Sequence, residues 1–138
     1  MAVFLEKPKG PEEIEALVTL CQEGLELLPT LTLQEKCEWA YENLWWYNAF
    51  RDDVPSGYVA LAWAEIDGKT IPHIHFGLVD EGDVRTVTTG WRHLKNTVPE
   101  EYDILAYIGY NNSKIIRLAK ILRFEETETE NLYIYRRK

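Results

Sequence analysis

The stretch YNNSKIIRLAKILRF, residues 110–124, decides the fold of this chain. Its apolar residues recur every three or four positions, which predicts an amphipathic helix over residues 113–122. Asn112 directly precedes this helix, at a position where asparagine commonly caps a helix N-terminus. Apolar runs at 103–110 and 132–135 predict a strand on each side. The last third of the chain is therefore expected to form a strand–helix–strand unit.

The rest of the chain supplies further elements in a definite order. Hydrophobic patterning and turn residues predict a strand at 3–6, helices at 11–28 and 33–45, strands at 58–66 and 70–79, and a helix at 84–96. A strand at 47–50 is left open, with its turn expected at 52–57. Thr32 with Glu35 gives a capping box, and Asp67-Gly68 is a hairpin signal. This order predicts a mixed α/β sheet with helices on both faces.

Composition narrows the classes of function. With 138 residues and 46% hydrophobic content, the chain is expected to form a single domain over residues 1–138. A formal net charge of −8 argues against a nucleic-acid partner, because phosphate binding needs a basic surface. Cys21 and Cys37 are expected to be free, buried thiols. The sequence shows no signal-peptide pattern and no apolar run long enough to span a membrane, so we expect a soluble, cytoplasmic protein without a membrane partner.

The order of elements resembles the GNAT superfamily of acetyl-CoA-dependent N-acyltransferases. The resemblance covers the whole chain in topology and is most specific in residues 110–124. GNAT proteins often carry an asparagine after the fifth strand and a phenylalanine where the last helix returns to the sheet, and Asn112 and Phe124 match these positions. The resemblance implies a single GNAT-like domain of order β-α-α-β-β-β-α-β-α-β, with acetyl-CoA as the cofactor.

In this family, a Q/R-x-x-G-x-G/A turn before the third helix holds the cofactor pyrophosphate through backbone N–H groups. The matching residues here are Arg85, Thr86, Val87, Thr88, Thr89 and Gly90. Thr88 replaces the middle glycine of the pattern, and its Cβ crowds a close approach of the backbone. A threonine-rich helix start that binds no anion is the alternative.

The resemblance also implies a gap between residues 76–79 and 104–108 that receives the pantetheine arm of the cofactor. Backbone N–H groups near Leu78 and Val79, together with the Asn112 amide, would bind this arm. Several cations lie nearby in the sequence and could attract the cofactor phosphates; they are Arg92, Lys95, Lys114, Arg117 and Lys120.

Acyl transfer to an amine needs a base for the ammonium proton. His73 and His75 share one face of the strand at 70–79, and imidazole titrates near neutrality. Glu65, on the preceding strand, is the second candidate and is expected to reach the same face. Cross-strand packing is the alternative role for the two histidines. No third ligand lies at metal-binding spacing, so no metal is expected.

The departing thiolate needs an acid, and here the chain departs from the family. Many GNAT proteins place a tyrosine where this chain has Ala119. Tyr107 and Tyr110, on or just after the strand at 103–110, are the nearby phenols that could substitute. Both could instead be ordinary sheet residues.

Two functions therefore stay open. The first is an N-acyltransferase that moves an acetyl group from acetyl-CoA to an unidentified small-molecule or protein amine. The second is a non-catalytic GNAT-like protein used for protein–protein contact or as a homodimer, similar to phage-encoded head-assembly or virion-associated proteins, in which case it would lie in the host cytoplasm or the virion. The acidic run at 125–130 is expected to be a solvated loop, or to attract a cationic acceptor.

Overall fold

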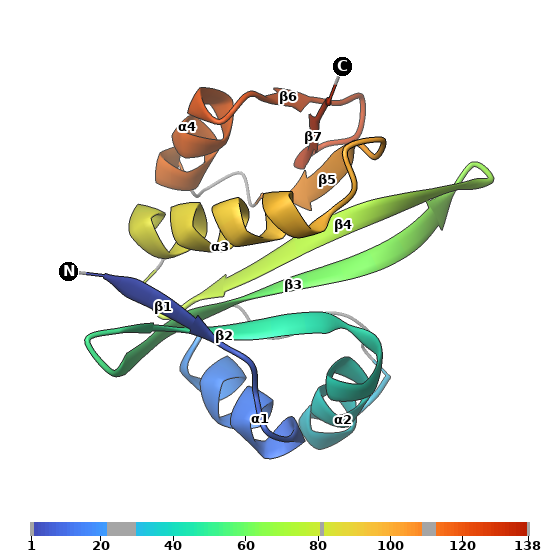
Figure 1. The fold of residues 1–138 in the computed structure, drawn as a ribbon. Helices are drawn as coiled ribbons and strands as arrows, with labels where there is room; N and C mark the ends of the chain where they lie inside the picture. Colours follow the sequence, from blue (N-terminus) through green and yellow to red (C-terminus); the bar gives the residue numbers. More distant parts are fainter. Residues whose placement is uncertain (1, 22–29, 81, 109–112, 138) are drawn as a thin grey trace.

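The computed structural model describes residues 2–21, 30–80, 82–108 and 113–137. A twisted central sheet separates the helix pair α1 and α2 from α3 and α4 (Figure 1). The elements in chain order are β1 (Val3–Glu6), α1 (Pro11–Leu20), α2 (Leu33–Asn43), β2 (Trp45–Arg51), β3 (Val54–Ile66), β4 (Lys69–Leu78), α3 (Val84–Thr97), β5 (Ile104–Tyr107), α4 (Ser113–Ile121), β6 (Phe124–Glu126) and β7 (Leu132–Tyr135).

The sheet is mixed, and its strand order is β1-β2-β3-β4-β5-β7-β6. All neighbouring strands are antiparallel except β4 and β5, which run parallel. A parallel pair needs a crossover connection, and α3 provides it. The predicted mixed α/β fold with helices on both faces is confirmed.

The hairpin of β3 and β4 sets which side chains face which helix pair. Its pairing runs without interruption from Gly57 opposite Leu78 to Ile66 opposite Lys69. Asp67 and Gly68 close it with φ angles of 52° and 75°, the left-handed geometry of a tight two-residue hairpin turn. Because successive side chains of a strand alternate, each residue on these strands faces one defined helix pair.

The two faces of the sheet carry separate hydrophobic cores. Ile74, Leu94 and Ile104 belong to the larger core, beneath α3 and α4, and each is almost fully buried. The smaller core lies beneath α1 and α2 and contains Ile14 and Trp46. The apolar positions of α3 recur at helical spacing, so its buried face covers the sheet continuously. Truncating Leu94 to alanine would cost about 2–5 kcal/mol, the usual range for a buried leucine.

Several boundaries differ from the sequence-based expectation. Strand β2 is real and begins at Trp45, earlier than 47–50, because α2 already ends at Asn43. The turn expected at 52–57 is only Asp52-Asp53, whose φ angles are 51° and 63°. Strand β3 therefore starts at Val54 and passes Pro55 with an irregularity in register opposite Ala49 and Phe50.

At the other end of the chain, part of the expected acidic loop is a strand. Phe124–Glu126 pair with β7 and form the outer strand β6, which patterning over three residues could not reveal. Helix α1 ends at Leu20, because Cys21 has an extended backbone as its C-cap, so the continuous helix expected at 11–28 is wrong at Cys21; residues 22–28 lie outside the described residues. Among the helices of the described segments, none is long and apolar enough to cross a membrane.

Candidate active site

A fork opens where the parallel strands β4 and β5 separate. Only two residue pairs join them, His73 with Leu105 and Ile74 with Ala106. Strand β4 continues to Leu78, but within the described residues nothing on β5 pairs with this extension. Beyond β5 the chain follows β7 instead, and the Ile108 N–H donates to the Asn131 carbonyl at 2.9 Å. This fork lies in the expected gap between 76–79 and 104–108.

The backbone N–H groups of β4 point alternately to the two neighbouring strands, β3 and β5. The Val79 N–H donates to the Ser56 carbonyl at 3.0 Å, and Ser56 belongs to β3. In an antiparallel pair the next residue points the other way, so the N–H of Leu78 is directed toward β5 and into the fork. Leu78 therefore offers a donor at the expected place. The expectation for the Val79 amide is wrong, because β3 already takes this hydrogen bond.

Two histidines and a tyrosine lie where the fork begins. The last residues that pair β4 with β5 are Ile74 and Ala106, and they are followed directly by His75 and Tyr107. Their side chains face α1 and α2, since Ile74 and Ala106 belong to the core beneath α3 and α4. The ring centroids of His73 and His75 are 4.8 Å apart, and those of His73 and Tyr107 are 6.5 Å apart. The structure thus brings three of the predicted catalytic residues together on one face.

Small neighbours and burial shape the chemistry of this cluster. Ala60 and Ala62 lie opposite His75 and His73 on β3, so neither imidazole has a polar cross-strand partner there. Burial, with a smaller contribution from the neighbouring His73, lowers the pKa of His75 from 6.5 to about 4. Burial also lowers the pKa of His73. Both imidazoles are therefore neutral near pH 7, the state that can accept a proton.

The remaining predicted acid and base residues are placed differently. Glu65 pairs with Thr70 near the hairpin tip, three positions from the Ala62–His73 pair, so its side chain is on the opposite face of the sheet from the histidines. The expectation that Glu65 reaches their face is wrong. Tyr110 and Asn112 lie outside the described residues, so their contacts are not described. Ala119, at the position of the family's usual tyrosine, is buried in the larger core.

The N-terminus of α3 is occupied by a side chain of the protein itself. Asp83 caps the helix: its carboxylate accepts from the Thr86 N–H at 3.1 Å and from the Thr86 hydroxyl at 2.7 Å. Arg51 also forms an ion pair with this carboxylate, whose side chain is only 3% exposed. A negative charge at this end of a helix is stabilised by the helix dipole.

Neighbouring amides at this turn also have partners within the chain. The Gly82 N–H donates to the Asp80 carboxylate at 3.1 Å, the Asp83 N–H to the Asp80 carbonyl at 3.0 Å, and the Val84 N–H to the Gly82 carbonyl at 2.8 Å. The Val87 N–H is directed to the Asp83 carbonyl at 3.4 Å. The described amides of this turn are thus largely used by the chain itself.

The stretch predicted to form the phosphate-binding turn, Arg85–Gly90, lies inside α3 rather than in a loop before it. Thr86 and Val87 are buried, and the Thr88 hydroxyl donates to the Val84 carbonyl at 2.7 Å. Gly90 packs on the sheet, where a methyl group would lie 3.0 Å from Phe76 Cε1 and 3.2 Å from Val59 Cβ. The glycine is explained by close helix–sheet packing, and Arg85–Gly90 belong to the helix expected at 84–96 rather than to a turn before it.

Sequence reasoning missed Asp83 and its partner Arg51, and it missed Ser56, whose hydroxyl is hydrogen-bonded with that of Thr86 at 3.0 Å. An aspartate three residues before a threonine, at the start of a helix, is a recognisable cap pattern that could have identified Asp83. No local pattern pointed to Arg51, which comes from β2. A pocket of about 300 Å³ lies beside this pair, and its wall includes Ser56, Val79 and Asp80.

No protein-family profile and no curated protein sequence matches this chain. Solved structures do match over nearly its whole length. A probable acetyltransferase from Staphylococcus epidermidis is 15% identical, with a TM-score of 0.68 and 96% of each chain covered. An acetyltransferase from Thermus thermophilus is 14% identical, with a TM-score of 0.64, covering 98% of this chain and 96% of that one. An N-acetyltransferase from Thermoplasma acidophilum in complex with coenzyme A is 15% identical, with a TM-score of 0.58 and 97% of each chain covered. The chain therefore has the GNAT-like fold of these acetyltransferases.

Proposed function

We propose that this protein is an N-acyltransferase, which transfers an acetyl group from a pantetheine thioester such as acetyl-CoA to an amine. The open fork between β4 and β5 carries the proposal. A parallel pair that separates after two residue pairs leaves strand edges that an extended, amide-containing arm can join by hydrogen bonds. Similar structures include one in complex with coenzyme A, which supports the same class of donor.

The fork and the α3 N-terminus differ in how well they fit coenzyme A. The Leu78 N–H faces the fork, so this part fits the pantetheine arm and its thioester carbonyl. The N-terminus of α3 does not fit the pyrophosphate, because the Asp83 carboxylate already lies there. A second anion at this position would face like-charge repulsion in a poorly hydrated site.

The side chains at the fork can handle the proton that acyl transfer releases. A pantetheine thioester supplies an activated acyl carbon and a thiolate leaving group. As the amine nitrogen bonds to this carbon and the C–S bond breaks, the nitrogen loses a proton and the sulfur gains one. His75, neutral at pH 7, accepts the proton from nitrogen, and the Tyr107 hydroxyl donates one to sulfur. The Leu78 N–H polarises the carbonyl.

Calorimetric titration with acetyl-CoA and with S-acetyl-pantetheine tests the proposal. We expect dissociation constants in the micromolar range, about −8 kcal/mol. Leu78→Pro removes an N–H that faces the fork and should weaken binding about tenfold, the size of one hydrogen bond. Leu78→Ala is the matched control, since it shortens the side chain but keeps the N–H. No heat and no thermal shift with either thioester at millimolar concentration would overturn the proposal.

The second candidate function is a non-catalytic GNAT-like protein that serves protein–protein contact. The observation that favours it is the closed N-terminus of α3, where Asp83 and Asp80 satisfy the turn with the chain's own carboxylates. This reading predicts that neither thioester binds and that Leu78→Pro changes nothing. None of the comparisons supports a phage origin.

A further inference from the structure

We propose that the natural acyl donor is an acidic carrier protein bearing a 4′-phosphopantetheine arm, and that this carrier docks on the outer surface of α3 and α4. The inference rests on the proposed acyltransferase function and names the donor for it. Three independent features of the molecule lead to it: the closed nucleotide site, the charge of the two helices, and their position beside the fork.

The first feature is that the structure favours the arm over the nucleotide. The fork presents the Leu78 N–H to a pantetheine chain, whereas the Asp83 carboxylate and the Asp80 side chain take donors at the α3 N-terminus. Free coenzyme A gains much of its recognition from its phosphates when a helix N-terminus is available to them. In this protein the Asp83 carboxylate removes the binding energy that the phosphates would supply, so a donor that brings only the pantetheine arm binds the site as well as coenzyme A does. Additional affinity for such a donor must come from contacts elsewhere on the protein surface.

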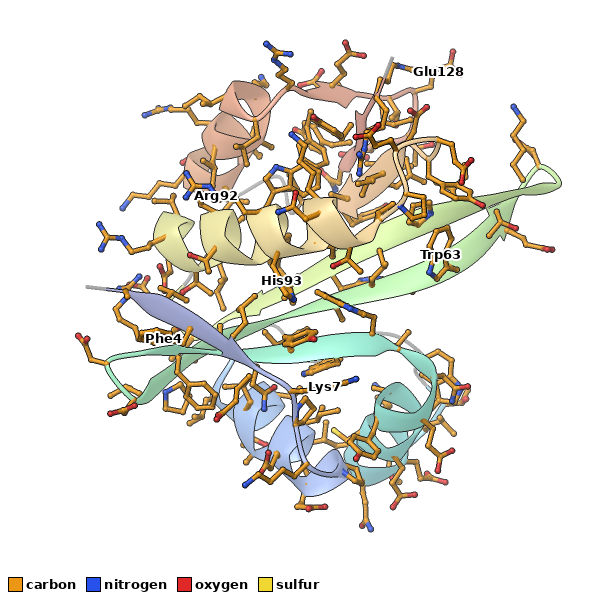
Figure 2. All side chains as sticks on the ribbon, viewed as in Figure 1. Phe4, Lys7, Trp63, Arg92, His93 and Glu128 are labelled. Atoms are coloured by element: carbon orange, nitrogen blue, oxygen red, sulfur yellow. The ribbon has the colours of Figure 1, made fainter. Side chains whose placement is uncertain are left out.

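The second feature is a marked separation of charge between the two helix pairs. Helices α3 and α4 carry three lysine or arginine residues each and no carboxylate, in a chain whose net charge is −8. Helix α1, across the sheet, carries three glutamates and no cation, and α2 carries three glutamates and one lysine. Besides Arg85, four of the cations on α3 and α4 are exposed; they are Arg92, Lys114, Arg117 and Lys120. Figure 2 shows Arg92 projecting from α3 on the side of α4.

The third feature is the position of this basic surface. Helix α3 follows β4 and helix α4 follows β5, so both helices begin at the end of the sheet where the fork opens. Their N-termini approach one another there: a methyl group on Gly82 would lie 3.1 Å from Lys114 Cδ and 3.3 Å from its Nζ. A protein docked on α3 and α4 can therefore direct a flexible arm into the fork.

An exposed apolar side chain within the basic surface favours a protein over a polynucleotide. Ile121, at the end of α4, is 72% exposed and lies one turn from Arg117. Apolar and arginine side chains at the centre of a patch are typical of protein interfaces, whereas phosphate contacts gain nothing from an isoleucine. The charge of the surface calls for an acidic partner. An acidic carrier protein with a pantetheine arm satisfies both the surface and the fork.

Steady-state release of the free thiol, with a simple primary amine such as ethylamine as the acceptor, tests the inference for three donors: S-acetyl-pantetheine, acetyl-CoA and a bacterial acetyl-carrier protein. We expect acetyl-CoA and S-acetyl-pantetheine to give kcat/KM values within about threefold of each other, because the nucleotide adds little binding. The acetyl-carrier protein should exceed both at least about tenfold at low salt, and this advantage should shrink as ionic strength rises.

Charge-reversal variants locate the docking surface. Arg117→Glu should lower the ratio of the carrier-protein kcat/KM to the S-acetyl-pantetheine kcat/KM about tenfold. Arg136→Glu is the matched control: Arg136 is also exposed, but it lies after β7 and pairs with Glu125 at 3.2 Å. The control should leave the ratio unchanged within about twofold. Circular dichroism should show that both variants are folded.

Other results would overturn the carrier donor, the docking surface or the acyltransferase function separately. If acetyl-CoA exceeds S-acetyl-pantetheine more than about tenfold, the nucleotide is held and the carrier inference fails while the acyltransferase function stands. If the carrier protein is no better than S-acetyl-pantetheine, or if Arg117→Glu leaves the ratio unchanged, the docking surface is overturned. If none of the three thioesters binds or reacts, the proposed function itself is wrong.

Discussion

Replacing Asp83 by alanine should destabilise the protein more than the loss of an ordinary helix cap. An N-cap side chain contributes about 1 kcal/mol, within a range of 0.5–2 kcal/mol. Asp83 also accepts a hydrogen bond from the Thr86 hydroxyl at 2.7 Å and pairs with Arg51. Hydrogen bonds to a charged group contribute about 1.5–3 kcal/mol. The Arg51 side chain is 36% exposed and can regain water, which offsets part of the loss. We expect a total cost of about 2–4 kcal/mol.

Urea unfolding followed by tryptophan fluorescence measures this cost. Thr32→Ala is the matched control, because Thr32 caps α2 through an exposed capping box and has no ion pair. It should cost only about 1 kcal/mol. Asp83→Asn separates the two contributions of the carboxylate: asparagine is an equally good cap but carries no charge, so about 1 kcal/mol should be regained relative to alanine.

A cost for Asp83→Ala no larger than that for Thr32→Ala would contradict this expectation. That result would mean that the Arg51 and Thr86 contacts contribute nothing beyond capping. It would also remove the argument that a firmly held carboxylate closes the α3 N-terminus. A lower m-value for Asp83→Ala would instead indicate a change in the surface exposed on unfolding.

Three further expectations concern other parts of the molecule. Gly77→Ala places a methyl group 2.0 Å from the Tyr58 ring, which stacks on Trp46, so we expect a loss of about 2 kcal/mol or more by urea unfolding, and a neutral substitution would contradict the packing. The low pKa of His75, about 4 against 6.5 when unfolded, means that only the unfolded chain gains a proton as pH falls from 6.5. The free energy of unfolding should therefore be level above pH 6.5 and fall by up to about 2 kcal/mol by pH 5, and His75→Gln should lose less over the same window. Burial raises the pKa of both Cys21 and Cys37 to about 11, so a thiol reagent at pH 8 should label neither until urea unfolds the chain, and rapid labelling of the folded protein would contradict their burial.

Much of the fold could be predicted because its signals are local. Helix α2 begins with Thr32 and Glu35, whose side chains and backbones form the reciprocal capping box that the sequence indicated. The hairpin turn at Asp67-Gly68 has the predicted left-handed geometry. These features depend on a few adjacent residues, so the sequence contains all that is needed to recognise them.

The outer elements were harder to predict because they depend on distant partners. Three residues of β6 pair with β7, and no pattern of three residues distinguishes a strand from a loop. The side of the sheet that Glu65 faces depends on the unbroken register from Gly57 to Ile66. A single bulge in this hairpin would have moved Glu65 to the face of the histidines, and the sequence does not reveal whether one occurs.

The same distinction explains why the two halves of the candidate site differ in predictability. The fork follows from the topology of the sheet. Strand β5 runs parallel to β4 of the longer β3–β4 hairpin and separates from β4 where its own chain turns toward β7. The hydrogen bond from the Ile108 N–H to the Asn131 carbonyl marks this turn. The α3 N-terminus instead depends on one side chain, Asp83, and on Arg51 from another strand. A single substitution can open or close this N-terminus without altering the fold, so the proposed preference for a pantetheine arm depends on Asp83 while the fork does not.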